Sequence, residues 1–181
     1  AAVGGASSPS RDVARRSGED TRLKLIRAAE ELFAERGIAA VSLREINRLA
    51  GQRNATALQY HFGTRGQLMA AVLARHRVGV GARRHALLDQ YEAGPRDLRM
   101  LTTALVVPEA SKLSDPDGGC AYLRIMAQLL QRAELSFDPA DPQAPHDSIH
   151  RWRRLVAEWM PELAVRRLHR RFTAIRILFV E

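Results

Sequence analysis

Cysteine is nearly absent from this chain, whose 181 residues include only Cys120. A single cysteine excludes an intrachain disulfide and a multi-cysteine zinc site, and it fits a reducing cytoplasm. Long apolar runs are also missing, since no stretch approaches the roughly 20 residues that a membrane-spanning helix needs. The N-terminus shows no signal-peptide stretch. We therefore expect a cytoplasmic protein without a membrane segment.

Acidic residues are scarce in one part of the chain. Its 28 lysines and arginines, of which only Lys24 and Lys112 are lysines, stand against 20 acidic residues, a net charge of +8. Residues 1–80 hold 13 basic and 7 acidic side chains, whereas residues 81–181 hold 15 and 13. An arginine-rich genome would raise the basic content evenly along the chain. The asymmetry therefore favours a polyanion-binding segment joined to a nearly neutral one.

Apolar residues make up 46% of the chain, and its length suits one or two small globular domains. Residues 1–18 lack apolar periodicity and are predicted to be a flexible basic arm. From Glu19 the apolar residues recur at helical spacing until Gly37, which ends this first helix. Its apolar face consists of Leu25, Ala28, Ala29, Leu32 and Phe33.

Capping residues predict three further helices. A serine or threonine followed three residues later by Glu or Gln is a capping box, and asparagine is a favoured N-cap. In chain order these are a helix over 43–50 after Ser42 and Glu45, one over 55–62 after Asn54, and a long one over 65–91 after Thr64 and Gln67.

The second half is also predicted to be helical. Its apolar stripes have helical spacing, with breaks at Pro108, at residues 115–119 and at the three prolines within 138–145. No stretch shows the alternation of a strand, so the fold class is all-α. The last stripe runs to Glu181 without a cap, which indicates either that the domain continues past it or that it docks against another subunit.

Two short helices joined by a glycine-containing turn in a basic segment are the layout of a helix-turn-helix, whose second helix enters the major groove of DNA. Hydroxyls at helix N-termini and arginines can hold phosphates, a tyrosine hydroxyl can reach one, and Gln or Asn can pair bidentately with adenine. These criteria select Ser42, Arg44, Arg53, Asn54, Thr56, Gln59, Tyr60, Thr64 and Arg65.

Four motifs follow one another between residues 21 and 75. They are the AA-LF-G pattern of the first helix, SLREI at 42–46, AG at 50–51 and YHFGTRGQL at 60–68. In order and spacing they resemble the N-terminal domain of TetR-family (tetracycline-repressor-like) transcriptional regulators. The resemblance covers roughly a third of the chain. It places Ser42 and Arg44 where helix two of the family touches phosphate or base, and Arg65 where the family has a phosphate-binding lysine. The recognition helix would carry Thr56, Ala57, Gln59, Tyr60 and His61.

The resemblance also implies an organisation for the whole chain. A helix-turn-helix domain over 19–66 would precede a helical effector-binding and dimerisation domain over 67–181. The protein would be a bacterial, cytoplasmic, nucleoid-associated homodimer. It would act as a repressor that a small, largely apolar effector releases from a palindromic operator. We expect no cofactor, no metal and no enzymatic activity. The candidate pocket residues are Met100, Leu101, Leu105, Cys120, Tyr122, Met126 and Phe172, and for each of them plain core packing is the favoured interpretation.

Two departures from the family pattern concern the base contacts. The stretch 51–58 is one residue longer than the usual turn, and Gln59 stands where the family commonly has an aromatic residue. These departures affect the expected base contacts of Arg53, Asn54 and Thr56. They do not affect the expected phosphate contacts of Tyr60 and Arg65.

Several candidates have a plainer interpretation. Phe62 is expected in the core and His61 is open between packing and DNA contact, whereas His146 and His150 have metal-ligand spacing but no third ligand. Trp152 and Trp159 share a helix face suited to the core or a dimer interface, and the arginines of 166–171 read as a solvated helix face. A non-specific architectural DNA-binding protein stays open as an alternative function.

Overall fold

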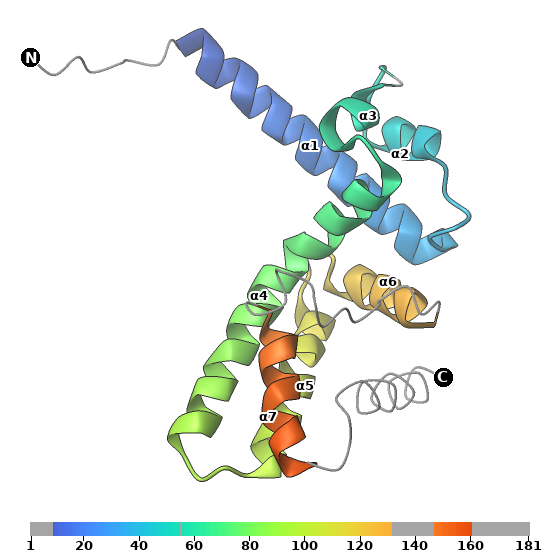
Figure 1. The fold of residues 1–181 in the computed structure, drawn as a ribbon. Helices are drawn as coiled ribbons and strands as arrows, with labels where there is room; N and C mark the ends of the chain where they lie inside the picture. The colour runs from blue at the N-terminus through green and yellow to red at the C-terminus, as the bar shows by residue number, and fades with distance from the viewer. Residues whose placement is uncertain (1–8, 55, 132–146, 161–181) are drawn as a thin grey trace, which may run out of the picture. The chain divides into compact units, whose positions relative to one another are not determined.

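The computed structural model describes residues 9–54, 56–131 and 147–160, and every regular element among them is a helix (Figure 1). This confirms the all-α prediction over the described residues. None of the described helices is long and apolar enough to cross a membrane. In order the elements are α1 Pro9–Arg36, α2 Leu43–Leu49, α3 Ala57–Phe62, α4 Arg65–Ala93, α5 Leu98–Ala110, the 3₁₀-helix η1 Ser111–Ser114, α6 Gly119–Gln131 and α7 Ser148–Trp159.

The chain divides into two compact units, Ala1–Val72 and Leu73–Glu181. The division falls within α4, after Val72. The first unit has its core on the predicted stripe of α1, where Leu25 and Phe33 are fully buried. α2 and α3 lie along α1 in Figure 1, and α2 contacts both of its neighbours. They contribute Ile46, Leu58 and Phe62 to this core.

The first helix begins earlier than predicted. α1 starts at Pro9 rather than Glu19, so the predicted flexible arm is helical from residue 9 onward. Proline is well suited to the first turn of a helix, and the alanine and arginines that follow it are good helix formers. Arg16 is exposed, as are Glu19 and Asp20. A helical segment without an apolar face leaves no periodicity in the sequence, which is why the pattern missed it.

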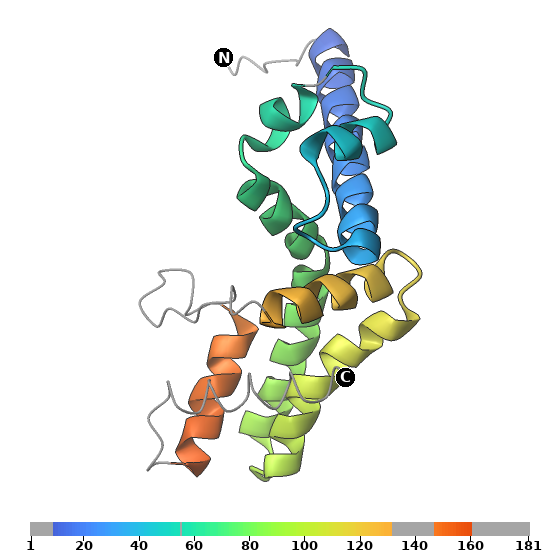
Figure 2. The ribbon, with the colours of Figure 1, turned by 90° about the vertical axis from the view of Figure 1, so that its right-hand side faces the viewer.

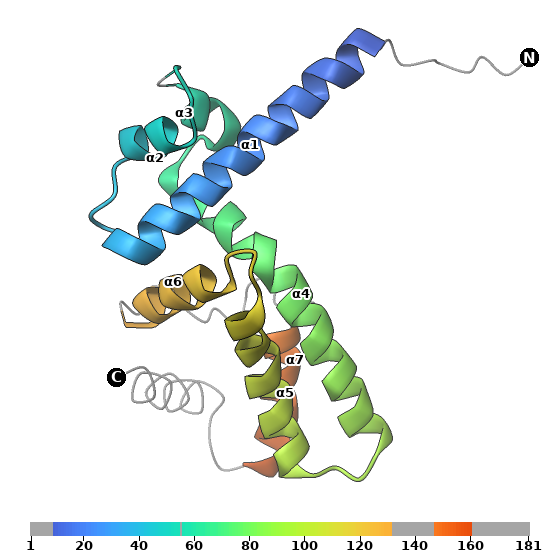
Figure 3. The same ribbon diagram turned by 180° about the vertical axis from the view of Figure 1, so that it is seen from behind.

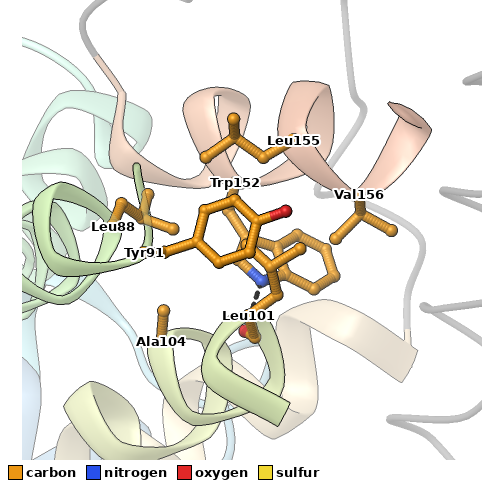
Figure 4. Packing of buried hydrophobic residues seen from close by; sticks show 7 residues of the cluster. All are labelled: Leu88, Tyr91, Leu101, Ala104, Trp152, Leu155 and Val156. Carbon is orange, nitrogen blue, oxygen red and sulfur yellow. Dashed lines mark hydrogen bonds between the residues drawn. The ribbon is translucent and has the colours of Figure 1, made fainter. Parts of the chain in front are cut away.

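In the second unit α4, α5 and α7 run side by side, and α6 lies across them (Figures 2 and 3). α4, α5 and α7 share a core, a cluster of seven buried residues shown in Figure 4. The indole Nε1 of Trp152 lies within it and donates to the Leu101 carbonyl at 2.7 Å. Trp159 is 45% exposed, and its Nε1 donates to the Tyr91 hydroxyl at 2.8 Å. The cluster consists of Leu88, Tyr91, Leu101, Ala104, Trp152, Leu155 and Val156.

The predicted break at Pro108 is wrong, because α5 continues through this residue to Ala110. Proline has no N–H, so the Ala104 carbonyl lacks its usual helical donor. The buried Arg84 of α4 supplies one instead, with Nε donating to this carbonyl at 3.2 Å. Its Nη1 donates to Ser148 Oγ at 2.9 Å and its Nη2 to Glu109 Oε1 at 3.1 Å. One arginine thus joins α4, α5 and α7.

Several sequence-based predictions lie outside the described residues. They concern the linker over 138–145, His146, Phe172, the arginines of 166–171 and the pattern that ends at Glu181. Of the predicted histidine pair, only His150 is described, and its Nδ1 lies 3.6 Å from Asp147 Oδ2.

Candidate DNA-binding site

The start of α2 is fixed by the predicted capping box. The Ser42 hydroxyl accepts from the Glu45 backbone N–H at 3.3 Å, and Glu45 Oε2 accepts from the Ser42 N–H at 2.8 Å. Arg36 Nη1 donates to Glu45 Oε1 at 3.1 Å, which joins the end of α1 to the same carboxylate. The hydrogen bonds from Ser42, with the charges of Arg36 and Arg48, lower the pKa of Glu45 below 4.5. The Ser42 hydroxyl is therefore engaged in holding α2.

A turn follows α2 and leads into α3. Gly51 takes φ +68°, a conformation that residues with side chains rarely adopt, and its N–H donates to the Arg48 carbonyl at 3.1 Å. Asn54 Oδ1 then accepts from the N–H of Thr56 at 2.9 Å and from its hydroxyl at 2.7 Å. This local turn delays α3, which begins at Ala57 rather than at residue 55 as predicted.

α3 separates an inner face from an outer one. Leu58 and Phe62 point into the core with 1% and 6% exposure, and Arg22 of α1 places its guanidinium carbon 5.0 Å from the Phe62 ring centroid. Gln59 and Tyr60 lie outside, and Tyr60 is 86% exposed. The half-buried His61 meets the Tyr60 ring edge-on at 5.2 Å. A buried phenylalanine confirms the core interpretation of Phe62, whereas the tyrosine is free of the core.

The corner between α3 and α4 is also built locally. Gly63 ends α3 at φ +65°, and the Thr64 N–H and hydroxyl donate to Gln67 Oε1 at 3.0 and 3.1 Å. The Gln67 N–H donates back to the Thr64 hydroxyl at 3.2 Å, which completes the second predicted capping box. The hydroxyls of Ser42, Thr56 and Thr64 thus form hydrogen bonds within the domain, although all three residues are exposed.

Three exposed arginines gather around the turn between α2 and α3. Arg44, Arg48 and Arg53 line one shallow depression, together with Asn47, Gly51 and Gln52. Arg44 and Arg53 are predicted site residues, whereas Gln52 is not. Arg48 has a signal in the sequence, because it lies four residues after Arg44 and so shares its helix face. Gln52 reaches the depression only through the turn, and no spacing rule places it there.

The side chain of Arg65 turns inward. It is half-buried at the start of α4, where Nη1 donates to the Val41 carbonyl at 2.7 Å and Nη2 donates to the Ile38 carbonyl. Its guanidinium carbon lies 5.1 Å from the centroid of the buried Phe33 ring. The guanidinium therefore points into the unit rather than toward solvent.

The predicted pocket residues are dispersed over the second unit. Leu101 belongs to the apolar cluster, and Met100 and Leu105 pack against it. Tyr122 and Met126 are buried on α6, with the Tyr122 ring 4.9 Å from that of His76. Cys120 is exposed. The structure thus gives the buried members core contacts and leaves Cys120 exposed.

Two short helices in contact, an exposed recognition surface and a rim of arginines define a helix-turn-helix DNA-binding domain. Residues 25–72 match the family described as "Bacterial regulatory proteins, tetR family". This segment is therefore similar to the DNA-binding domain of that family of transcriptional regulators.

Curated relatives share this part of the chain. The HTH-type transcriptional regulator TtgR of Pseudomonas putida is 36% identical over 59 residues, which are 33% of this chain and 28% of that protein. The HTH-type transcriptional repressor Rv3405c of Mycobacterium tuberculosis is 42% identical over 55 residues, 30% of this chain and 29% of that protein. The regulator Mb3439c of Mycobacterium bovis matches to the same extent. The matched segment spans less than a third of the length of each relative.

Proposed function

We propose that this chain is a dimeric transcriptional repressor that binds a palindromic operator and is released from it by a small, largely apolar effector. The observation that carries the DNA-binding part is the outer face of α3. Its inner face is locked by Leu58 and Phe62, so Gln59 and Tyr60 project from a fixed helix. A rigid helix that carries a polar outer face suits the major groove, which is about 12 Å wide and admits an α-helix.

The chemistry of this surface assigns different roles to its side chains. Gln59 carries an amide that can pair bidentately with adenine, so we assign it base recognition. The exposed hydroxyl of Tyr60 and the guanidinium groups of Arg44 and Arg53 suit phosphate oxygens. His61 and Ala57, both half-buried on α3, complete the proposed contact surface with Asn54, Thr56, Thr64 and Ser42.

The repressor part is supported by the relatives and by the second unit. One matched relative is named a repressor. The second unit carries its own helical core, and a helix shared between two units is a physical route for coupling two sites. In a homodimer two α3 helices about 34–36 Å apart would meet successive major grooves on one face of the DNA. An effector would release DNA by favouring another spacing.

Selection from a library of random DNA duplexes with the full chain tests the DNA-binding proposal. We expect enrichment of an inverted repeat with half-sites about one helical turn apart. Gln59→Ala should change the preferred base at one position of each half-site, while Tyr60→Phe should weaken binding to all duplexes alike. Gln90→Ala, the same substitution at an exposed position of α4 in the second unit, is the matched control and should leave the motif unchanged. No enrichment of any motif would favour the alternative, a non-specific architectural DNA-binding protein.

The effector part has its own test. Naphthalene, indole and decanoic acid are small apolar probes, and one that binds the folded chain raises its melting temperature by mass action. We expect such a compound also to lower the affinity for the selected duplex. A compound that stabilises the protein but leaves the DNA affinity unchanged would contradict release by that class of ligand.

A further inference from the structure

Arg65 sits in a slot formed by residues far away in the chain. The carbonyls that it binds belong to Val41 and Ile38, 24 and 27 residues earlier, and the aromatic ring beneath it belongs to Phe33 of α1. The planar guanidinium presents donors in a rigid fork and packs its face on aromatic rings. Both terminal nitrogens are used, and the slot therefore matches an arginine in shape as well as in charge.

The two carbonyls lie in the connector between α1 and α2. The side chains of Ile38 and Val41 are 7% and 2% exposed, so this connector is anchored in the core. Val41 directly precedes Ser42, the N-cap of α2, and Ser42 is joined through Glu45 to Arg36 at the end of α1. A backbone carbonyl outside regular structure needs a donor, and here the first residue of α4 supplies it.

The Arg65 contacts connect the two helices that flank the recognition helix α3 in the sequence. α3 stands between α2 and α4 in the sequence. Its two ends are tied to them by the turn that contains Gly51, Asn54 and Thr56 and by the corner at Gly63 and Thr64. Fixing the start of α4 to the start of α2 therefore fixes the frame that holds α3.

We propose that Arg65 is a positioning residue of the DNA-binding unit and not a phosphate contact. It sets the orientation of α2 and α4 around α3, so its effect on DNA affinity comes from the geometry of its fork and not from its charge. This inference rests on the proposed DNA-binding function for its affinity test, and its structural part can be tested without DNA.

A charge-conserving substitution separates the two roles. A lysine keeps the positive charge that a phosphate contact requires, but it lacks the planar fork that binds two carbonyls over the Phe33 ring. We expect Arg65→Lys to weaken binding to the selected duplex by about tenfold or more, close to the loss in Arg65→Ala. The slope of log K against log salt should stay unchanged, whereas loss of one phosphate contact lowers it by about 0.9. Near wild-type affinity for Arg65→Lys, or a reduced slope for Arg65→Ala, would overturn the proposal.

Arg53 provides the matched comparison because it is an exposed arginine of the same unit. Arg53→Ala should reduce the salt slope and Arg53→Lys should retain it, as expected of a charge that acts on DNA. Phe33→Leu removes the ring beneath Arg65 without changing the charge, and it should reproduce the Arg65→Lys result. Each variant is measured at a temperature at which its circular dichroism matches that of the unaltered chain.

Amide hydrogen exchange of the free protein tests the tether itself. In Arg65→Lys, peptides covering residues 38–46 should exchange faster than in the unaltered chain, while Arg53→Ala should leave them unchanged. Unchanged exchange in Arg65→Lys would overturn the positioning role, whatever the DNA results. If the unaltered chain bound no DNA selectively but the exchange result held, the proposed function would fail and the tether would stand.

Discussion

Replacing Arg84 should lower the free energy of unfolding of the second unit strongly, and a second substitution at Pro108 should restore part of that loss. Arg84→Met leaves the Ala104 carbonyl, the buried Ser148 hydroxyl and the Glu109 carboxylate without the donors that bind them. Breaking a buried, hydrogen-bonded charge pair costs about 3–5 kcal/mol. A buried acceptor left unpaired contributes about 1–3 kcal/mol of such a loss. The Ala104 carbonyl incurs this cost because Pro108, four residues later, has no N–H to donate to it.

Pro108→Ala restores that N–H, so the two substitutions form a double-mutant cycle. In the Pro108→Ala background, Arg84→Met should cost about 1–2 kcal/mol less than in the unaltered chain, because the Ala104 carbonyl then has a helical donor. Effects of Pro108→Ala on packing occur in both backgrounds and cancel in the cycle.

Urea denaturation of the full chain, followed by circular dichroism, measures the free energy of unfolding for the four proteins. Arg83→Met is the control, since Arg83 is an exposed arginine beside Arg84 on the same helix, and it should change the stability by less than about 0.5 kcal/mol. An equal cost of Arg84→Met in both backgrounds would refute the argument that this arginine replaces the missing proline N–H.

Three further changes have defined outcomes. Trp152→Phe should lower the free energy of unfolding by about 1–3 kcal/mol because it leaves the buried Leu101 carbonyl without the indole donor, and Trp159→Phe, at a 45% exposed site, should cost less. Gly63→Ala should lower the melting temperature, since φ is +65° and a Cβ would lie 2.8 Å from Gln67 Oε1, whereas Gly79→Ala, in open space within α4, should raise it. The pKa of Glu45 is lowered on folding, so the carboxylate stabilises the fold above pH 4.5 and this stabilisation is lost as the pH falls through the folded-state pKa. In Glu45→Gln the free energy of unfolding should therefore fall less on acidification. An unchanged decrease would contradict the capping role of the carboxylate.

Local chemistry made much of the first unit predictable. The boxes of Ser42 with Glu45 and of Thr64 with Gln67 close within three residues, so the sequence alone contains the complete interaction. Gly63 likewise ends α3 where its position indicates. The start of α1 could not be found in this way because residues 9–18 show no apolar periodicity in the sequence.

The interactions that the sequence could not predict are long-range. Arg65 finds its acceptors 24 and 27 residues away, and a sequence motif that ends in a basic residue does not say which way the side chain turns. Pro108 looks like a helix break because the compensating donor, Arg84, is on another helix. Tertiary partners decide both cases, and no local rule includes them.

The proposed function depends most on sequence-specific DNA binding by α3. Fluorescence anisotropy with the selected inverted repeat and with a scrambled duplex of the same composition, at about 0.15 M salt, measures it most directly. Specific DNA-binding proteins prefer their site by about 10³ or more, and we predict a ratio of that order that falls sharply in Gln59→Ala. Equal affinity for the two duplexes would contradict the account.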